Sequence, residues 1–189
     1  MAPLVRRSWA PCGQTLVLVQ PGAHQRKVSV IAALCVAPGR DRLRLYFRLY
    51  PDANIQARHV IAFLARLGRE LRGPWLLLWD RRNAHRARLT TQFLAAHPYP
   101  LPCFFPPYAP ELNPVEYAWG YLQMNPLANL ACFDTLALSQ TARQPARTRQ
   151  RKPSLLRSCL HPRPLFCVSN RTLLMQVSII GLLEVCSPS

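Results

Sequence analysis

Two acidic side chains stand out because of the residues around them. Asp80 directly follows the apolar run 74–79, and Glu116 ends the proline-rich stretch 106–116. The chain has 8 acidic residues against 24 lysines and arginines, so an acid at the end of a buried strand requires an explanation. Carboxylates are the oxygen ligands that Mg²⁺ and Mn²⁺ prefer. The pair predicts a divalent-metal site for chemistry on a phosphodiester backbone, although two-metal phosphoryl transfer normally needs a bridging carboxylate as well.

Asp80 also has a purely structural interpretation. Arg81 and Arg82 follow it directly, and either could form a salt bridge with it where the next helix begins. His85 is likewise open to two interpretations, a contact to a phosphate or leaving group, or a cap on the surface of that helix.

Glu116 fits the start of a helix equally well. With Asn113 as the N-cap, Pro114 falls at N1 and Glu116 at N3, which is the spacing of a capping box. Leu112 and Tyr117 are then placed for a hydrophobic staple. Local helix chemistry therefore explains the motif, but a rigid cap also aims a metal ligand, so the two interpretations can coexist.

Hydrophobic periodicity predicts the elements before Asp80. Residues 16–20 and 28–36 are typical of strands, with a turn at 38–41, and alternation over 43–50 predicts a half-buried strand. These three strands would form an antiparallel meander. Apolar residues spaced by three and four from Val60 to Leu71 then predict a helix that ends at Gly73 and Pro74.

The elements around the two acids follow the same reasoning. The short run 75–79 predicts a strand buried on both faces, and residues 84–96 predict a helix. Residues 103–105 predict a second buried strand, and a new helix begins at Pro114. The resulting α/β order is β-β-β-α-β-α-β-α. The 35 residues between the acids leave room for a helix, a strand and a loop, and ligands gather at the carboxyl ends of such strands.

The pattern ends near residue 136. Residues 144–157 are rich in Arg and Pro with little periodicity, and they predict a solvated tail suited to clamping phosphates. The apolar segment 173–185 is too short to span a membrane and contains Gln176 and Glu184, so we expect a helix or strand and no membrane role. We predict a catalytic region at 1–136 and a basic Arg/Pro-rich tail at 137–189 with an atypical apolar C-terminus.

The amino-acid composition indicates which class of molecule the protein binds. The net charge of +16 favours a polyanion, most commonly nucleic acid, and nearly all of the basic residues are Arg, which binds phosphate and guanine in bidentate fashion. A GC-rich genome would give the same bias. Seven widely spaced cysteines without a Cys-x-x-Cys pair, and the absence of a signal peptide, predict reduced thiols in the cytosol.

Two stretches of sequence carry a resemblance. Residues 76–80 with His85 and Arg86, followed by 105–119, closely resemble the endonuclease domain of DDE transposases, in the bacterial insertion-sequence 630 group of the mariner superfamily. Residues 7–15 are similar to that group's segment after its first catalytic strand, and the resemblance covers about residues 4–165.

The resemblance implies a ribonuclease H-like mixed sheet flanked by helices, and metal-dependent cleavage and joining of DNA strands with Mg²⁺ or Mn²⁺. Asp80 would be the second catalytic acid and Glu116 the third. The candidates for contacting DNA, at transposon ends and target, are five residues of the same motifs: Arg81, Arg82, His85, Arg86 and Asn113. A homodimer is left open, and the protein would be cytoplasmic and nucleoid-associated when bound to DNA.

The sequence also departs from this group. The group's first Asp lies on a strand just before the segment similar to 7–15, but no acidic residue precedes Asp41, which lies in the predicted turn. We therefore expect a sheet that lacks its first strand and an isolated chain that does not cut DNA. The group's helix-turn-helix region is also missing from this sequence.

Three functions follow from these observations: a transposase catalytic fragment, an inactive DNA-binding remnant of a transposase, or an unrelated basic α/β binding module whose acids only cap helices. The motif strings disfavour the third.

Overall fold

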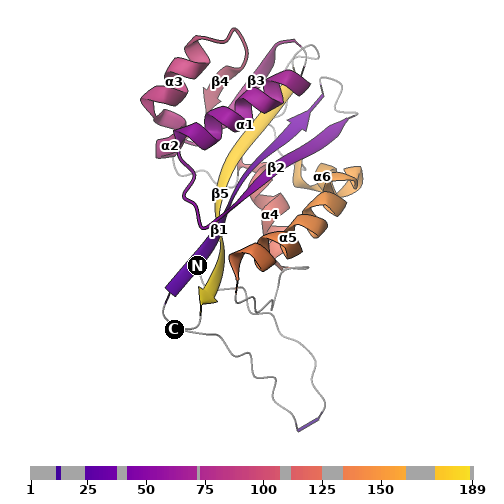
Figure 1. Cartoon of the computed structure of the whole chain (residues 1–189). Helices are drawn as coiled ribbons and strands as arrows, with labels where there is room; N and C mark the ends of the chain where they lie inside the picture. Colours follow the sequence, from indigo (N-terminus) through magenta and orange to yellow (C-terminus); the bar gives the residue numbers. More distant parts are fainter. Residues whose placement is uncertain are drawn as a thin grey trace.

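The fold is a mixed α/β arrangement built on one five-stranded sheet (Figure 1). The computed structural model describes residues 12–13, 24–37, 42–71, 73–106, 112–124, 134–160 and 173–187. The strands are β1 (His24–Val36), β2 (Leu43–Pro51), β3 (Trp75–Trp79), β4 (Leu101–Phe104) and β5 (Leu173–Ser187). The helices are α1 (Ala57–Glu70), α2 (Asn83–Arg86), α3 (Arg88–Ala95), α4 (Pro114–Met124), α5 (Thr135–Gln150) and α6 (Pro153–Leu160).

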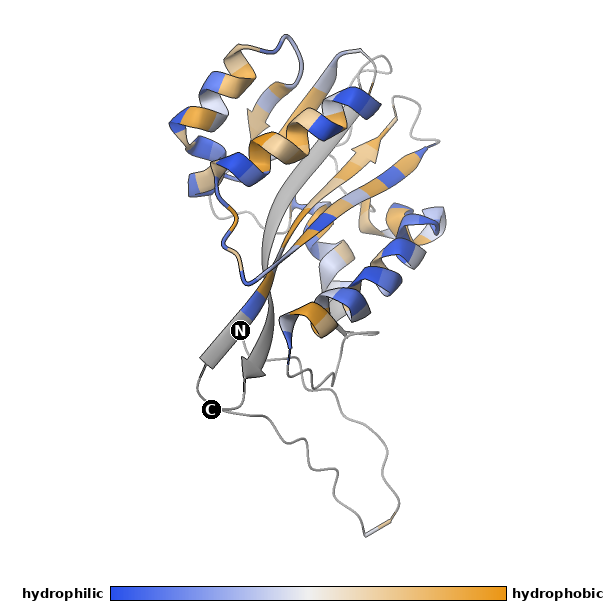
Figure 2. Ribbon diagram, viewed as in Figure 1, coloured by the Kyte–Doolittle hydropathy of each residue, from blue (hydrophilic) through white to orange (hydrophobic). Residues whose placement is uncertain are grey.

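Helices cover both faces of the sheet. In Figure 1, α1, α2 and α3 lie on one side and α4, α5 and α6 on the other. Figure 2 shows hydrophobic colours along the described part of β1 and along β3 and alternating colours on β2, whereas most of α5 is hydrophilic. The core is therefore divided by the sheet into two layers.

Strand β1 contributes to both layers because its side chains alternate in direction. Val30, Ala32 and Leu34 belong to the layer with α4, α5 and α6. Ile31 and Ala33 belong to the layer with α1. An uninterrupted apolar run is what a strand covered on both faces needs, and the sequence 28–36 supplies it.

Strand β5 lies at the centre of the sheet, which has the order β2-β1-β5-β3-β4. It pairs antiparallel with β1 along residues 24–36 and parallel with β3 along residues 75–78. The hairpin β1–β2 and the parallel pair β3–β4 have no pairing with each other, so β5 is what joins them into one sheet.

Several predicted elements are confirmed. The strands predicted at 28–36 and 43–50 form an antiparallel pair. The strand at 75–79 and the helix that begins at Pro114 have the predicted positions. Helix α1 ends before Gly73, as predicted. The helix predicted at 84–96 is divided at Ala87, whose backbone is extended, into α2 and α3. The strand predicted at 16–20 and the turn at 38–41 lie outside the described residues.

The prediction of a solvated tail at 144–157 is wrong. Asp134 caps α5 by accepting a hydrogen bond from the Ala137 N–H at 3.3 Å, and the Gln150 side chain donates to the Leu45 carbonyl on β2. A stripe at helical spacing packs α5 against the sheet, and its members are Leu138, Ala142, Ala146 and Arg149. Pro145 and the arginines obscured this stripe, and tertiary packing overrides their weak helix propensity. The predicted boundary at residue 136 stays a prediction.

The strand predicted at 103–105 is present, but it covers Leu101–Phe104 and the prediction of its burial is wrong. Strand β4 covers Leu101–Phe104, and all four of its residues are exposed because it forms one edge of the sheet. Pro102 is compatible with an edge strand, where a missing N–H leaves no gap in the ladder. Only the following Phe105 is buried.

Within the described part of the chain, no helix is long and apolar enough to cross a membrane.

Because β5 pairs with both halves of the sheet, a chain ended after Leu160 should lose cooperative unfolding. The cost of separating β1 from β3 is expected to exceed the about 5–15 kcal/mol that stabilises a typical domain. Heating curves followed by circular dichroism would measure this. A chain ended after Ser187 keeps β5 and is the control. A sharp transition of the shorter chain at the temperature of the full chain would show that β5 does not hold the sheet together.

Candidate functional site

Asp80 is placed by the strand before it. Trp75, Leu77 and Trp79 of β3 are all buried in the layer with α1, so the strand is anchored along its length. The Trp79 carbonyl accepts a hydrogen bond from the Phe105 N–H at 2.9 Å, which ties the end of β3 to the chain after β4. Asp80 follows directly, and its side chain is 29% exposed. The acid therefore lies at the carboxyl end of a rigid strand, as expected for a ligand-binding position.

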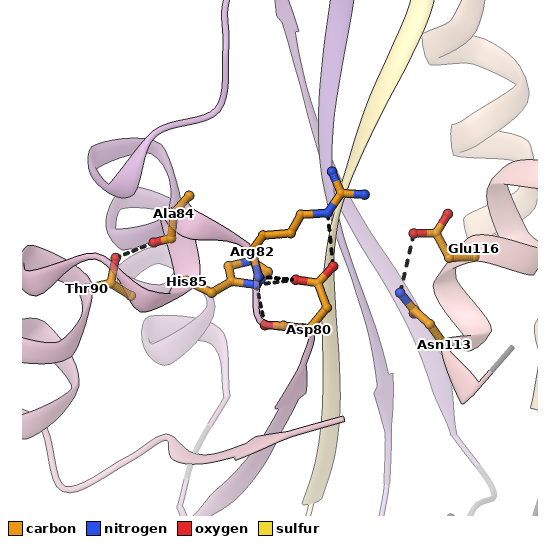
Figure 3. Close-up of polar contacts among 7 residues, drawn as sticks. All are labelled: Asp80, Arg82, Ala84, His85, Thr90, Asn113 and Glu116. Carbon is orange, nitrogen blue, oxygen red and sulfur yellow. Dashed lines mark hydrogen bonds and ion pairs between the residues drawn. The ribbon is translucent and has the colours of Figure 1, made fainter. Parts of the chain in front are cut away.

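The Asp80 carboxylate has two cationic or polar neighbours (Figure 3). Its Oδ2 accepts from the Arg82 Nε at 3.0 Å, and its Oδ1 accepts from the Arg82 backbone N–H at 3.2 Å. The His85 Nδ1 lies 2.7 Å from Oδ1 and 3.0 Å from the Asp80 carbonyl oxygen. The structural interpretation of Asp80, a salt bridge at the start of the next helix, is thus present, and Arg82 is the partner.

His85 is buried, and its ring contacts Asp80. Its side chain is 1% exposed, and its ring stacks on Trp79 with a centroid distance of 4.4 Å and an interplanar angle of 19°. Because both atoms near Nδ1 are acceptors, we assign the proton to Nδ1. The Nε2 is buried and forms no hydrogen bond with any residue that the structure describes. A surface cap is therefore ruled out for His85, and a phosphate contact would require the ring to leave its position.

These contacts decide the charge of Asp80. Burial raises its pKa, but the hydrogen bond and charge of His85, together with the backbone N–H and charge of Arg82, outweigh burial and lower the pKa below its ordinary value. The carboxylate is consequently ionised at neutral pH and oriented before any ligand binds.

Glu116 is placed by the first turn of α4. The buried Asn113 accepts a hydrogen bond from the Val115 N–H at 3.2 Å through its Oδ1, as an N-cap does. Its Nδ2 lies 3.5 Å from the Glu116 Oε1, and the Glu116 N–H donates to the Asn113 carbonyl at 3.1 Å. The predicted helix start is confirmed. Asn113 also orients the Glu116 carboxylate, so the helix cap is compatible with a role of Glu116 as a metal ligand.

The two carboxylates come from different elements and point toward one another in Figure 3, with the Arg82 guanidinium near Asp80. Both acids offer oxygen ligands, and neither is fully buried. This suits Mg²⁺ or Mn²⁺, with water or phosphate oxygens completing the coordination of the ion. Asp80 keeps lone pairs beyond those that Arg82 and His85 use. Among the described residues, no group of three His, Cys, Asp or Glu side chains could hold a metal, so these two acids form a partial ligand set.

The residues predicted to contact DNA fall into two groups. Arg81, Arg82 and Arg86 are exposed, and the Arg81 guanidinium lies over the Phe104 ring, 5.8 Å from its centroid. His85 and Asn113 are buried and act on the two acids instead. The site thus has exposed arginines at its rim and buried side chains that contact the two acids.

Sequence reasoning missed the aromatic support of the site. Phe104 stacks on Trp79 at a centroid distance of 5.9 Å, and Trp79 stacks on His85. Periodicity identified Trp79 as buried, but it gave no sign that the His six residues later would lie on the same ring. That contact arises because α2 follows Asp80 after only two residues and turns back over β3.

Comparison with known proteins yields one match. A family model described as DDE superfamily endonuclease matches residues 2–137, which include both acids and the elements from β1 to α4. No curated protein and no solved structure matches the chain.

Asp80→Asn should destabilise the protein by about 1–3 kcal/mol at pH 7, because charge-assisted hydrogen bonds to Arg82 and His85 are weakened. The folded pKa of Asp80 lies below its unfolded value, so the stabilisation is complete above the unfolded pKa and is lost as pH falls through the folded pKa. Urea unfolding of both proteins between pH 7 and pH 3 would test this.

The difference between wild type and Asp80→Asn should shrink toward pH 3. Glu70→Gln is the matched control, since Glu70 forms an exposed pair with Arg66 and should contribute little at any pH. A difference for Asp80→Asn that stays constant with pH would contradict the assigned role of the ionised carboxylate.

Proposed function

The chain belongs to the DDE superfamily of endonucleases, and on that premise we propose that it is the catalytic region of a transposase of the insertion-sequence 630 and mariner type. Its substrate is DNA, at transposon ends and target. The observation that carries the proposal is the pair of acids: Asp80 at the end of β3 and Glu116 in the first turn of α4 face one another from separate elements.

DDE superfamily endonucleases generally depend on a divalent metal. In this proposal Asp80 and Glu116 hold Mg²⁺ or Mn²⁺, which when bound would polarise a phosphodiester and favour a nucleophilic water or hydroxyl. His85 and Asn113 keep the two carboxylates in position. Arg81, Arg82 and Arg86 form a positive rim that suits contact with DNA phosphates.

We further infer that the sheet is a ribonuclease H-like sheet in which β5 occupies the position beside β3. A third carboxylate for this site has to come from a strand next to β3, because adjacent parallel strands end at the same edge. Strand β4 carries no acid. Strand β5 pairs Leu78 with Gln176, so residues 176–178, which are Gln, Val and Ser, reach the level of Asp80.

The acidic residue of β5, Glu184, lies too far along the strand to contribute a carboxylate to the site. Ser178 is level with Asp80 in this register, and Glu184 comes six residues after it, about 20 Å at the rise of a strand. The position next to β3 in the sheet is thus occupied by β5, which has no carboxylate level with Asp80. We conclude that the 189-residue chain binds DNA and one metal weakly and does not cut DNA by itself, and that a strand bearing the first Asp would have to displace β5. The second candidate, an inactive DNA-binding remnant, makes the same prediction for the isolated chain.

Titration calorimetry of the purified chain with Mn²⁺ tests the metal site. We expect weak binding that becomes at least about tenfold weaker in Asp80→Asn and in Glu116→Gln, since each removes a direct ligand. Glu70→Gln should leave the Mn²⁺ affinity unchanged, because its carboxylate pairs with Arg66 on the exposed side of α1. Equal affinities in all four proteins would rule out the site.

Incubation with supercoiled plasmid and Mn²⁺ tests the catalytic conclusion. The chain should shift the plasmid in a gel, with an affinity that falls steeply as salt rises, and should leave it unnicked. Nicking that disappears in Asp80→Ala would overturn the conclusion that β5 leaves the site incomplete, and would identify the chain itself as an active endonuclease. Absence of any DNA binding would contradict the proposed function as a whole.

A further inference from the structure

Arg149 is a buried cation outside the acidic site. It continues the stripe of Leu138, Ala142 and Ala146 by which α5 packs on the sheet, and its side chain is 3% exposed. Removing a guanidinium from water costs several kcal/mol unless a partner replaces the lost hydration. The position of Arg149 therefore calls for an anionic or polar partner.

The contacts that Arg149 makes are weak ones. Its Nη2 donates to the Cys159 Sγ of α6 at 3.0 Å, and sulfur is a poor acceptor. Its guanidinium carbon lies 4.3 Å from the centroid of the Tyr121 ring on α4. Its Nε and Nη1 are buried, and no described residue forms a hydrogen bond with either of them. In the described part of the chain Arg149 pairs with no carboxylate, so donors that match an oxyanion are left without one.

Arg149 is one of the residues that line a groove between α4, α5 and α6, which lie together on one face of the sheet in Figure 1. The cavity measures about 450 Å³, enough for a phosphate group and part of the chain it belongs to. Besides Arg149 and Tyr121 its wall includes Thr141, Gln144, Thr148 and Lys152. The residues that line it include no acid, and Lys152 at its rim adds a second positive charge.

We propose that this groove is a binding subsite for a backbone phosphate of DNA, with Arg149 donating from Nε and Nη1 and Lys152 supplying the second charge. The proposal rests on the proposed function for its ligand, because DNA supplies the phosphate. Guanidinium forks match phosphate oxygens, and such charged hydrogen bonds strengthen when water is excluded. The Tyr121 ring, which also lines the groove, contacts the Arg149 guanidinium in a cation–π interaction.

The subsite is joined to the acidic site by one helix. Tyr121 follows Glu116 on α4 by five residues, a rise of about 7.5 Å along the axis. A DNA strand whose phosphate lies near the two acids can therefore extend toward Arg149 within a few nucleotides. The groove would fix the register of the strand, since phosphate contacts position DNA without reading its sequence.

Arg149→Met is the decisive variant, because it keeps the length of the side chain and removes the charge. A structural role for Arg149 predicts that this change destabilises the protein. The proposed role predicts the opposite in phosphate-free buffer, a melting temperature equal to or above that of wild type, because an uncompensated buried charge is removed. Arg147→Met, an exposed arginine on the same helix and outside the groove, is the matched control.

Inorganic phosphate is the probe for the subsite itself. At matched ionic strength it should raise the melting temperature of wild type and Arg147→Met, and should leave that of Arg149→Met unchanged. Binding to a DNA duplex should weaken about tenfold to a hundredfold in Arg149→Met. The slope of log affinity against log salt should fall by about one unit, as for one lost phosphate contact.

The outcomes separate the two proposals. If phosphate stabilises wild type through Arg149 but the chain binds no DNA, the subsite stands and the proposed function fails. If DNA binds equally to Arg149→Met and Arg147→Met, the subsite is overturned and the proposed function stands. If Arg149→Met does not fold, the Nε–H resonance of Arg149 in wild type decides: a shift on titration with phosphate supports the subsite, and no shift overturns it.

Discussion

The backbone pairing of β5 with both β1 and β3 is the interaction on which the rest of the structure depends. The antiparallel hairpin on one side and the parallel pair on the other do not meet without it. Each helix layer packs across this junction, because β1 and β3 both contribute to the layer covered by α1. Strand β5 pairs with β3, which leads to Asp80, and contacts α4, whose first turn carries Glu116. A segment far from both acids in sequence thus contacts both of the elements that carry them.

Local patterns in the sequence predicted much of the fold. The apolar run of β3, the alternation of β2 and the Asn-Pro-x-Glu start of α4 each depend on residues a few positions apart, and each has the predicted element. The stripe on α5 was also local, but two of its four members are alanines and one is an arginine, so hydrophobicity alone did not mark it. The central place of β5 was not predictable, since pairing over more than a hundred residues leaves no local periodicity.

The candidate site divides in the same way. The positions of both acids, the arginine pair after Asp80 and the cap at Asn113 could be read from spacing. The burial of His85 could not, because it depends on the Trp79 ring beneath it and on the tight turn into α2. The result is that a residue expected at the surface instead determines how the carboxylate of Asp80 is oriented.

The two charged positions in the interior differ in what they lack. Asp80 is an anion whose carboxylate already accepts hydrogen bonds from Arg82 and lies 2.7 Å from the His85 ring nitrogen, so a metal ion would share it with these partners. Arg149 is a cation whose Nε and Nη1 have no hydrogen-bond partner among the described residues, so an anion need displace none of these from them. Free energy is therefore more readily gained at Arg149 than at Asp80 when DNA and metal are both present. Under the proposed function, DNA binding at Arg149 therefore displaces fewer existing contacts than metal binding at Asp80.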